Sequence, residues 1–121
     1  MSQILVVDDD PMVRSFMEIF LGEVSGHDVH CVATIAEARK TVTDSLPDVL
    51  VVDFLLPDGN GLDLGLETLR DEPHLCVVLV TGLELTEVCR TVARDREIPV
   101  LRKPFELEEL LVLVGKGLSQ K

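Results

Sequence analysis

The sequence predicts a single α/β domain in which a five-stranded parallel sheet is covered by helices on both faces. Short apolar runs rich in β-branched residues are typical of parallel strands that are buried on both sides. Amphipathic segments alternate with these runs, which favours a doubly wound (βα)5 three-layer sandwich. The chain has 121 residues, of which 46% are hydrophobic and 27% charged, as expected for one globular domain spanning residues 1–121. Right-handed crossovers leave few arrangements of such a sheet, and the expected one is the flavodoxin-like strand order 2-1-3-4-5.

The first strand is predicted at residues 4–7, where four apolar residues stand in a row. A helix follows, because Asp10 is a good N-cap and Pro11 is well suited to the first helical position. Gly26 is expected to close this helix. Six apolar residues recur at helical spacing and predict one buried stripe: Val13, Phe16, Met17, Phe20, Leu21 and Val24.

The second strand is short and is predicted at residues 29–32. Thr34 and Glu37 have the spacing of a capping box and mark the start of the second helix. This helix is expected to run to about Leu46, because Pro47 follows. The third strand then occupies residues 49–53.

The second half of the chain repeats the alternation of strands and helices. Residues 57–61, Pro-Asp-Gly-Asn-Gly, form the strongest turn signal in the sequence. The next helix carries Leu62, Leu66 and Leu69. A strand ending at Thr81 precedes a helix with apolar residues at Leu85, Val88, Cys89, Val92 and Ala93. The fifth strand is predicted at residues 98–101, and Glu108 and Glu109 lie in the first turn of the last helix, where negative charge favours the helix dipole.

Four predicted strands end at residues that can bind a cation or a phosphoryl group: Asp8 and Asp9, Asp53, Thr81, and Lys103. Because ligands bind outside the carboxyl ends of parallel strands, these side chains should share one site. Two carboxylates about 5 Å apart repel by roughly 3 kcal/mol at an effective dielectric near 20. The acidic cluster therefore requires a hard cation or must take up protons, and oxygen-only ligands beside a phosphate site favour Mg²⁺.

The individual residues also have simpler interpretations. Asp10 is better explained as a helix cap than as a metal ligand. Asp53 lies between apolar residues, where an unpaired charge is costly, so a functional role is preferred. Thr81 alone would be an ordinary strand residue, and Lys103 alone would be a surface lysine. Their positions at strand ends, next to Gly82 and Pro104, favour a hydroxyl and an ammonium directed at the site.

Charge and composition exclude several classes of function. The net charge is −11, with 22 acidic and 11 basic residues, so direct binding to nucleic acid or to an anionic membrane surface is not expected. No signal peptide is expected, and no apolar stretch in the sequence is long enough to span a bilayer. Three cysteines without metal-ligand spacing are expected to be reduced and buried, which favours a cytoplasmic location.

Taken in order, these motifs resemble those of response-regulator receiver domains of two-component signalling, and the resemblance covers essentially the whole chain. It implies that Asp53 accepts a phosphoryl group from a phosphohistidine of a sensor histidine kinase or phosphotransfer protein. Asp8, Asp9, Asp53 and the backbone carbonyl of Leu55 would hold Mg²⁺. Thr81 and Lys103 would bind the phosphoryl oxygens, and the Lys103–Pro104 bond would be cis. The switched surface would act on a downstream protein target or output domain.

The sequence departs from this family at three positions. Val100 replaces an aromatic residue that often serves as a switch in the family. Leu55 and Leu83 replace residues that are often polar, two positions after Asp53 and Thr81. Apolar side chains over the site should hinder an attacking water, so slow self-dephosphorylation is expected.

The last helix is apolar on more than one face over residues 110–114. Deep packing of this helix is one interpretation. The other is a homodimer or partner surface formed by the last helix together with Val100 of the fifth strand.

Parts of the sequence are compatible with two other functions. The strand followed by Asp8 and Asp10 also fits a haloacid-dehalogenase-type phosphatase, with Asp8 as nucleophile and Asp10 as acid–base. That alternative leaves Asp53 without a role, and no acidic pair follows Lys103. A binding module that is never phosphorylated is the third alternative, and the complete set of site residues argues against it.

Overall fold

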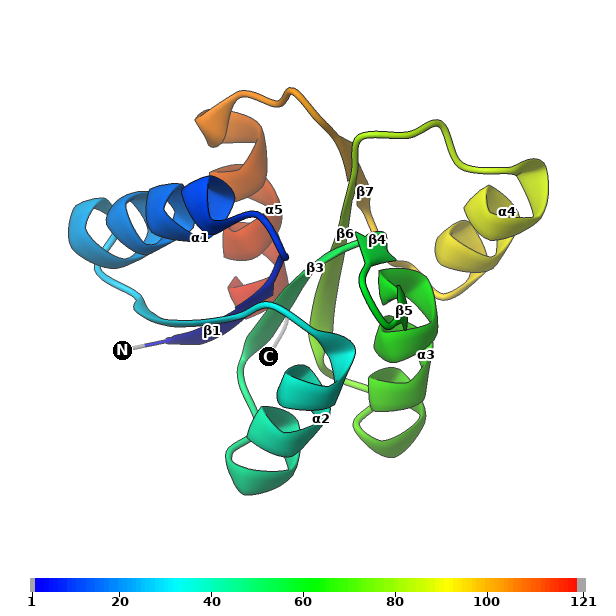
Figure 1. Cartoon of the computed structure of the whole chain (residues 1–121), viewed down its shortest axis with the longest axis horizontal. Helices are drawn as coiled ribbons and strands as arrows, with labels where there is room; N and C mark the ends of the chain where they lie inside the picture. The colour runs from blue at the N-terminus through cyan, green and yellow to red at the C-terminus, as the bar shows by residue number, and fades with distance from the viewer. Residues whose placement is uncertain (1, 120–121) are drawn as a thin grey trace.

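The computed structural model describes residues 2–119, which form a five-stranded parallel sheet between two layers of helices (Figure 1). Across the sheet the strands are β2 (Asp28–Val32), β1 (Gln3–Val7), β3 (Val49–Asp53), β6 (Cys76–Thr81) and β7 (Val100–Arg102). In chain order this is 2-1-3-4-5, so the predicted doubly wound, flavodoxin-like topology is confirmed. No helix within residues 2–119 has the length and hydropathy needed to cross a bilayer.

The helices divide between the two faces of the sheet. One face is covered by α2 (Ile35–Asp44), α3 (Gly61–Asp71) and α4 (Glu87–Asp95). The other is covered by α1 (Pro11–Met17), its continuation η1 (Glu18–Val24), and α5 (Leu107–Ser119).

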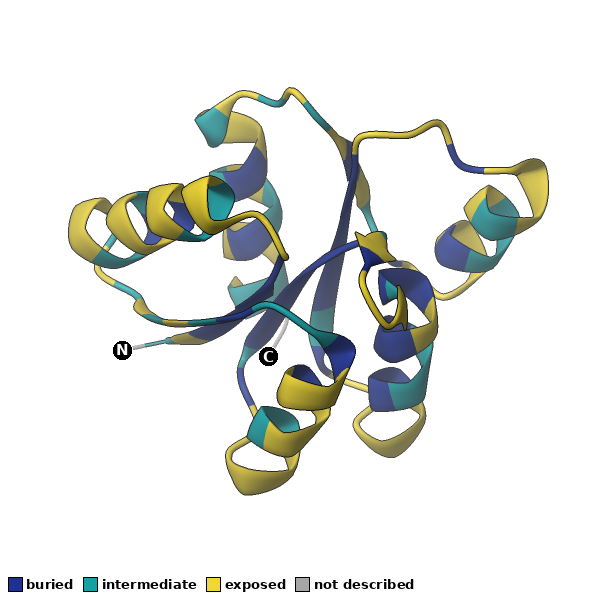
Figure 2. Ribbon diagram, viewed as in Figure 1, coloured by how far each residue is buried: buried dark blue, intermediate teal, exposed yellow. Residues whose placement is uncertain are grey.

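Successive strand residues point to opposite faces. Leu5 and Leu50 therefore contribute to one core, and Val6 and Val51 contribute to the other. The central strands are buried along their length (Figure 2), which explains why their sequences are apolar without alternation.

Two predicted helix caps are present. The Asp10 carboxylate accepts a hydrogen bond from the Met12 amide at 2.9 Å, and Pro11 is the first residue of α1. The Thr34 hydroxyl accepts a hydrogen bond from the Glu37 amide at 3.2 Å at the start of α2. These local contacts satisfy helix amides that have no partner inside the helix.

The first helix differs from the predicted regular stripe. Met17 and Leu21 are buried, but Phe16 and Val24 are 43% and 65% exposed. From Glu18 the helix widens into the π-helix η1, where the Ser25 amide bonds to the Phe20 carbonyl five residues earlier, at 3.1 Å. This wider turn changes which side chains face the sheet.

Three boundaries also differ from the prediction. Helix α2 ends at Asp44 instead of near Leu46. Leu85 is buried but precedes α4, whose N-cap is Thr86. Strand β7 begins at Val100, because the Ile98 amide bonds to Ala93 at the end of α4, at 2.8 Å.

The predicted turn at residues 57–61 lies within a small antiparallel hairpin. Its strands are β4 (Leu55–Leu56) and β5 (Gly59–Asn60), placed between β3 and α3. Gly61 starts α3 close to the end of β3, and a Cβ atom there would overlap the Asp53 carbonyl oxygen. Glycine at this position lets the chain turn directly beside Asp53.

Candidate functional site

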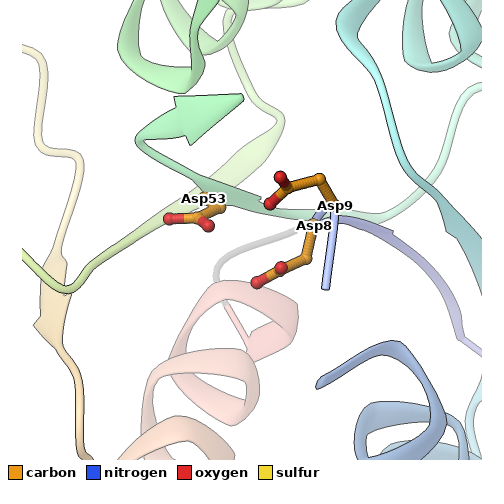
Figure 3. Close-up of side chains that lie close together, drawn as sticks. All are labelled: Asp8, Asp9 and Asp53. Atoms are coloured by element: carbon orange, nitrogen blue, oxygen red, sulfur yellow. The ribbon is translucent and has the colours of Figure 1, made fainter. Parts of the chain in front are cut away.

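Three carboxylates meet where β1 and β3 end. The two strands are neighbours, with Val7 paired to Val52, so the residues that follow them emerge side by side. Asp8, Asp9 and Asp53 each place one carboxylate oxygen within 4.8 Å of the others (Figure 3). Asp8 and Asp53 are 3% and 8% exposed, whereas Asp9 faces solvent. The predicted acidic cluster is therefore present, with one open side.

Lys103 reaches this cluster from the far end of the chain. Its Nζ atom lies 3.0 Å from Asp8 Oδ2 and 3.3 Å from Asp53 Oδ2. The Lys103 amide bonds to the Thr81 carbonyl at 2.8 Å, and the Lys103–Pro104 peptide bond is cis, as the resemblance implied. One ammonium group thus bridges two of the three acids.

The electrostatics of the cluster favour an incoming cation. Burial and the nearby Asp8 charge raise the pKa of Asp53, and the Lys103 ammonium opposes this increase. Burial alone would lower the pKa of Lys103. The hydrogen bonds and negative charges of Asp8 and Asp53 have the larger effect, so the pKa of Lys103 is raised. Lys103 therefore remains charged, yet it does not fully compensate the acids.

A cavity of about 430 Å³ opens beside these side chains. Asp9, Asp53 and Lys103 line it, together with apolar and small residues from two loops: Leu55, Leu56, Pro57, Gly82 and Leu83. Leu55 and Leu83 are 62% and 53% exposed at the cavity. A ligand on Asp53 would therefore have carboxylates and an ammonium on one side and two leucines around it.

Thr81 is at the predicted strand end but does not join the cluster. Its buried hydroxyl accepts a hydrogen bond from the Leu83 amide and donates one to the Leu83 carbonyl, both at 3.0 Å. Within residues 2–119 these are the hydrogen bonds of this hydroxyl. The Thr81 side chain is thus engaged by its own loop.

Asp10 and Leu55 complete the predicted set of residues. The Asp10 carboxylate caps α1, so it lies outside the group of converging acids, as the helix-cap interpretation required. The main chain of Leu55 donates a hydrogen bond to the Asp53 carboxylate, which opposes part of the increase in the pKa of Asp53 that burial causes. The loop after β3 thereby holds the Asp53 side chain.

Sequence reasoning missed two polar residues that support the site. Arg14 donates from Nη1 to the backbone carbonyl of Asp8 at 2.9 Å. Asp58 accepts from the amides of Ile35 and Ala36 at 2.9 and 3.0 Å, tying the loop after β3 to the start of α2. The Pro-Asp-Gly turn signal marks Asp58 as a turn residue, but no sequence pattern joins it to a helix 22 residues away.

The donor atoms of the cluster fit a small hard cation. All three converging side chains offer carboxylate oxygen, and the group carries more negative charge than Lys103 neutralises. Mg²⁺ prefers such oxygen ligands and needs few protein carboxylates, because it retains several waters. The exposed side at Asp9 leaves room for those waters.

Comparisons with known proteins agree with this site. Residues 4–115 match the family described as the response regulator receiver domain. The response regulator protein PilR of Pseudomonas aeruginosa is 31% identical over 114 residues, covering 94% of this chain and 25% of that protein. The chain spans about a quarter of the length of PilR and of the NtrC regulators that it also matches.

Solved receiver domains have the same fold. The HemR receiver domain from Leptospira biflexa superposes with a TM-score of 0.86 at 28% identity, covering 98% of this chain and 95% of that one. A CheY-like receiver domain protein from Methanospirillum hungatei gives a TM-score of 0.90 at 23% identity, covering 99% and 95%. With its acidic pocket and its family match, the chain belongs to the response regulator receiver domains, the phosphoacceptor modules of two-component signalling.

Proposed function

We propose that Asp53 is the residue that accepts the phosphoryl group, from a phosphohistidine of a sensor histidine kinase or a phosphotransfer protein. The observation that carries this proposal is the position of the Asp53 carboxylate. It lies at the end of β3, lines the cavity, and is 3.3 Å from the Lys103 ammonium. No other acid combines burial, access to the cavity and these neighbours within the described part of the chain.

In this reaction an Asp53 carboxylate oxygen forms a bond to phosphorus. The phosphorus–nitrogen bond of the phosphohistidine breaks, and its electron pair stays with the imidazole, which takes up a proton. Lys103 would neutralise a phosphoryl oxygen as a point charge. Phosphoryl transfer depends mainly on such positioning and charge neutralisation.

Asp8, Asp9, Asp53 and the backbone carbonyl of Leu55 would hold Mg²⁺. The bound ion would neutralise negative charge on the phosphoryl oxygens. The Asp8 carboxylate is held by hydrogen bonds that it accepts from the Asp10 amide at 2.9 Å and from Lys103 at 3.0 Å.

Thr81 would report phosphorylation to the surface. A phosphoryl group on Asp53 offers the Thr81 hydroxyl a charged acceptor that is stronger than the Leu83 carbonyl. To donate to it, the Thr81 hydroxyl must release the hydrogen bond that it now donates to the Leu83 carbonyl. The loop that follows Gly82 would then move toward the site and change the surface ahead of α4.

The proposal is tested by incubation with acetyl phosphate and Mg²⁺, followed by intact mass measurement and peptide mapping. The wild type should gain one phosphoryl group on Asp53, and the Asp53→Asn variant should gain none. Asp71→Asn is the matched control, because Asp71 is an exposed acid at the end of α3 and should not affect labelling. Labelling that persists in Asp53→Asn would refute the assignment.

The phosphatase alternative makes a different prediction in the same experiment. It requires Asp8 to be the nucleophile and Asp10 to act on the substrate, yet the Asp10 carboxylate is committed to the start of α1. Phosphate on Asp8 in the peptide map would favour the phosphatase. The present contacts favour Asp53.

We also propose a homodimer surface at β7 and α5, which would respond to phosphorylation. β7 is an edge strand, where Val100 is 40% exposed, and Val112 on α5 is 54% exposed. A second copy could cover these valines, whereas a downstream target or an output domain could use the same face. Light scattering before and after phosphorylation, with Val112→Glu as the variant, tests the dimer.

A cytoplasmic location is part of the same proposal. Cys31, Cys76 and Cys89 are thiols that form no disulfide within residues 2–119, as in proteins kept under reducing conditions.

A further inference from the structure

Arg14 is a second cation at the acidic site, and the proposed function gives it no role. It is half-buried in α1, and its guanidinium Nη1 donates to the backbone carbonyl of Asp8 at 2.9 Å. Lys103, in contrast, bonds directly to carboxylate oxygens. The two cations therefore act on different parts of the same acidic residue.

The geometry of α1 explains why Arg14 reaches Asp8. Side chains on a helix point back toward its N-terminus, so Arg14 extends over the end of β1. The Asp8 carbonyl lies beyond Val7, the last paired residue of β1, although the Asp8 amide still bonds to the Val32 carbonyl at 3.1 Å. The guanidinium supplies a donor to this carbonyl just where the sheet ends.

Besides the bond from its amide to Val32, Asp8 is held by three hydrogen bonds. Its Oδ1 accepts from the Asp10 amide at 2.9 Å, its Oδ2 accepts from Lys103 at 3.0 Å, and its carbonyl accepts from Arg14 at 2.9 Å. The first two contacts hold the carboxylate. The third holds the peptide unit that determines where the carboxylate points.

The backbone of Arg14 is held by the neighbouring strand β2. The Cys31 thiol on β2 donates to the Arg14 carbonyl at 3.7 Å, within the wider limit for sulfur. Among the ion pairs of residues 2–119, none joins Arg14 to a carboxylate. Arg14 therefore places positive charge at the site without occupying the lone pairs that a metal ion would use.

We infer that Arg14 is a positioning residue for the Mg²⁺ site: by holding the Asp8 backbone, it keeps the Asp8 carboxylate directed at the cation. This inference rests on the proposed function, because it presupposes that the acidic cluster binds Mg²⁺. Groups that orient metal ligands typically change metal affinity by 10–100-fold when they are removed.

The test is direct Mg²⁺ binding, measured by calorimetry and by amide chemical shifts, without a phosphoryl donor. Arg14→Gln should bind Mg²⁺ about tenfold more weakly than the wild type. Arg90→Gln is the control, because it removes the same charge from an exposed residue of α4. It should bind Mg²⁺ as the wild type does. At saturating Mg²⁺, the Arg14→Gln protein should be phosphorylated at the wild-type rate.

Repeating the titration in high salt separates positioning from simple charge. Salt screens a through-space effect of the guanidinium, whereas loss of the carbonyl contact persists. If the Arg14→Gln defect disappears in high salt, or if this folded variant binds Mg²⁺ as the wild type does, the inference is overturned. Should Arg14→Gln not fold, Arg14→Met tests the same prediction. Failure of the wild type to bind Mg²⁺ would instead overturn the proposed function.

Discussion

The Asp53→Asn variant should be more stable than the wild type when Mg²⁺ is absent. Asp53 is needed for function, but its charge lies beside two other carboxylates. Burial and the Asp8 charge raise the pKa of Asp53, so the ionised form is less favourable in the folded protein than in the unfolded chain. An asparagine keeps the shape of the side chain and removes this penalty.

The distances allow an estimate of the size of the effect. Oxygens within 4.8 Å of each other repel by at least about 3.5 kcal/mol per pair at an effective dielectric near 20. Asp8 and Asp9 together therefore oppose the Asp53 charge by about 7 kcal/mol, while Lys103 at 3.3 Å offsets about 5 kcal/mol. The net cost of about 2 kcal/mol falls to about 1 kcal/mol if solvent entering through the open side at Asp9 doubles the effective dielectric for the whole cluster.

The pH dependence has a definite sign. Because the pKa of Asp53 is raised in the folded state, the folded protein holds this proton more tightly than the unfolded chain does. As the pH rises above 3.8, the ordinary pKa of an aspartate side chain, ionisation of Asp53 lowers the free energy of unfolding. The advantage of Asp53→Asn should be complete at neutral pH and should vanish well below pH 3.8, where Asp53 is protonated in both states.

Urea unfolding in EDTA and in Mg²⁺ measures this effect. In EDTA the variant should unfold at a higher urea concentration, by roughly 0.5–1 M for an m-value of about 2 kcal/mol/M. Mg²⁺ should stabilise the wild type and reduce or reverse the difference, because Asp53→Asn has lost a ligand. If the variant in EDTA at neutral pH is no more stable than the wild type, the acids are not net repulsive and the reasoning fails.

Three further predictions concern the loop around Asp53. The amides of α2 lower the pKa of Asp58, so the ionised Asp58 stabilises the fold above pH 3.8, and this stabilisation is lost as the pH falls through the folded-state pKa. Urea unfolding should therefore show that Asp58→Asn is less stable than the wild type at neutral pH, and that the difference in the free energy of unfolding disappears at acidic pH. Gly61→Ala should lower the free energy of unfolding by about 2–3 kcal/mol, because the added Cβ overlaps the Asp53 carbonyl. Gly115→Ala is the control and should not destabilise the protein, because open space surrounds that position. Equal effects of the two variants would contradict the close approach of Gly61 to Asp53. Leu55→Asn should shorten the lifetime of the phosphorylated protein several-fold in Mg²⁺ buffer, since Leu55 lies exposed at the cavity where water must enter; an unchanged or longer lifetime would show that this leucine does not exclude water.

The order of the strands and the edge that carries the site could be predicted because they depend on local patterns. Apolar runs such as residues 49–52 show a strand that is buried on both sides, and the acid that ends the run must appear at the carboxyl edge. The caps at Asp10 and Thr34 were predictable for the same reason, since each bonds to an amide two or three residues away. The sequence alone therefore determined the fold, the acidic cluster and the approach of Lys103.

Only the tertiary structure decided how individual side chains are used. Thr81 is at the predicted strand end, but its hydroxyl bonds to Leu83, a choice between rotamers that no spacing reveals. The support of Asp8 by Arg14 depends on how α1 packs over β1. The bond from Asp58 to α2 spans 23 residues at Ile35. Such contacts depend on the packed positions of several elements at once, whereas periodicity and capping act within a few residues of the chain.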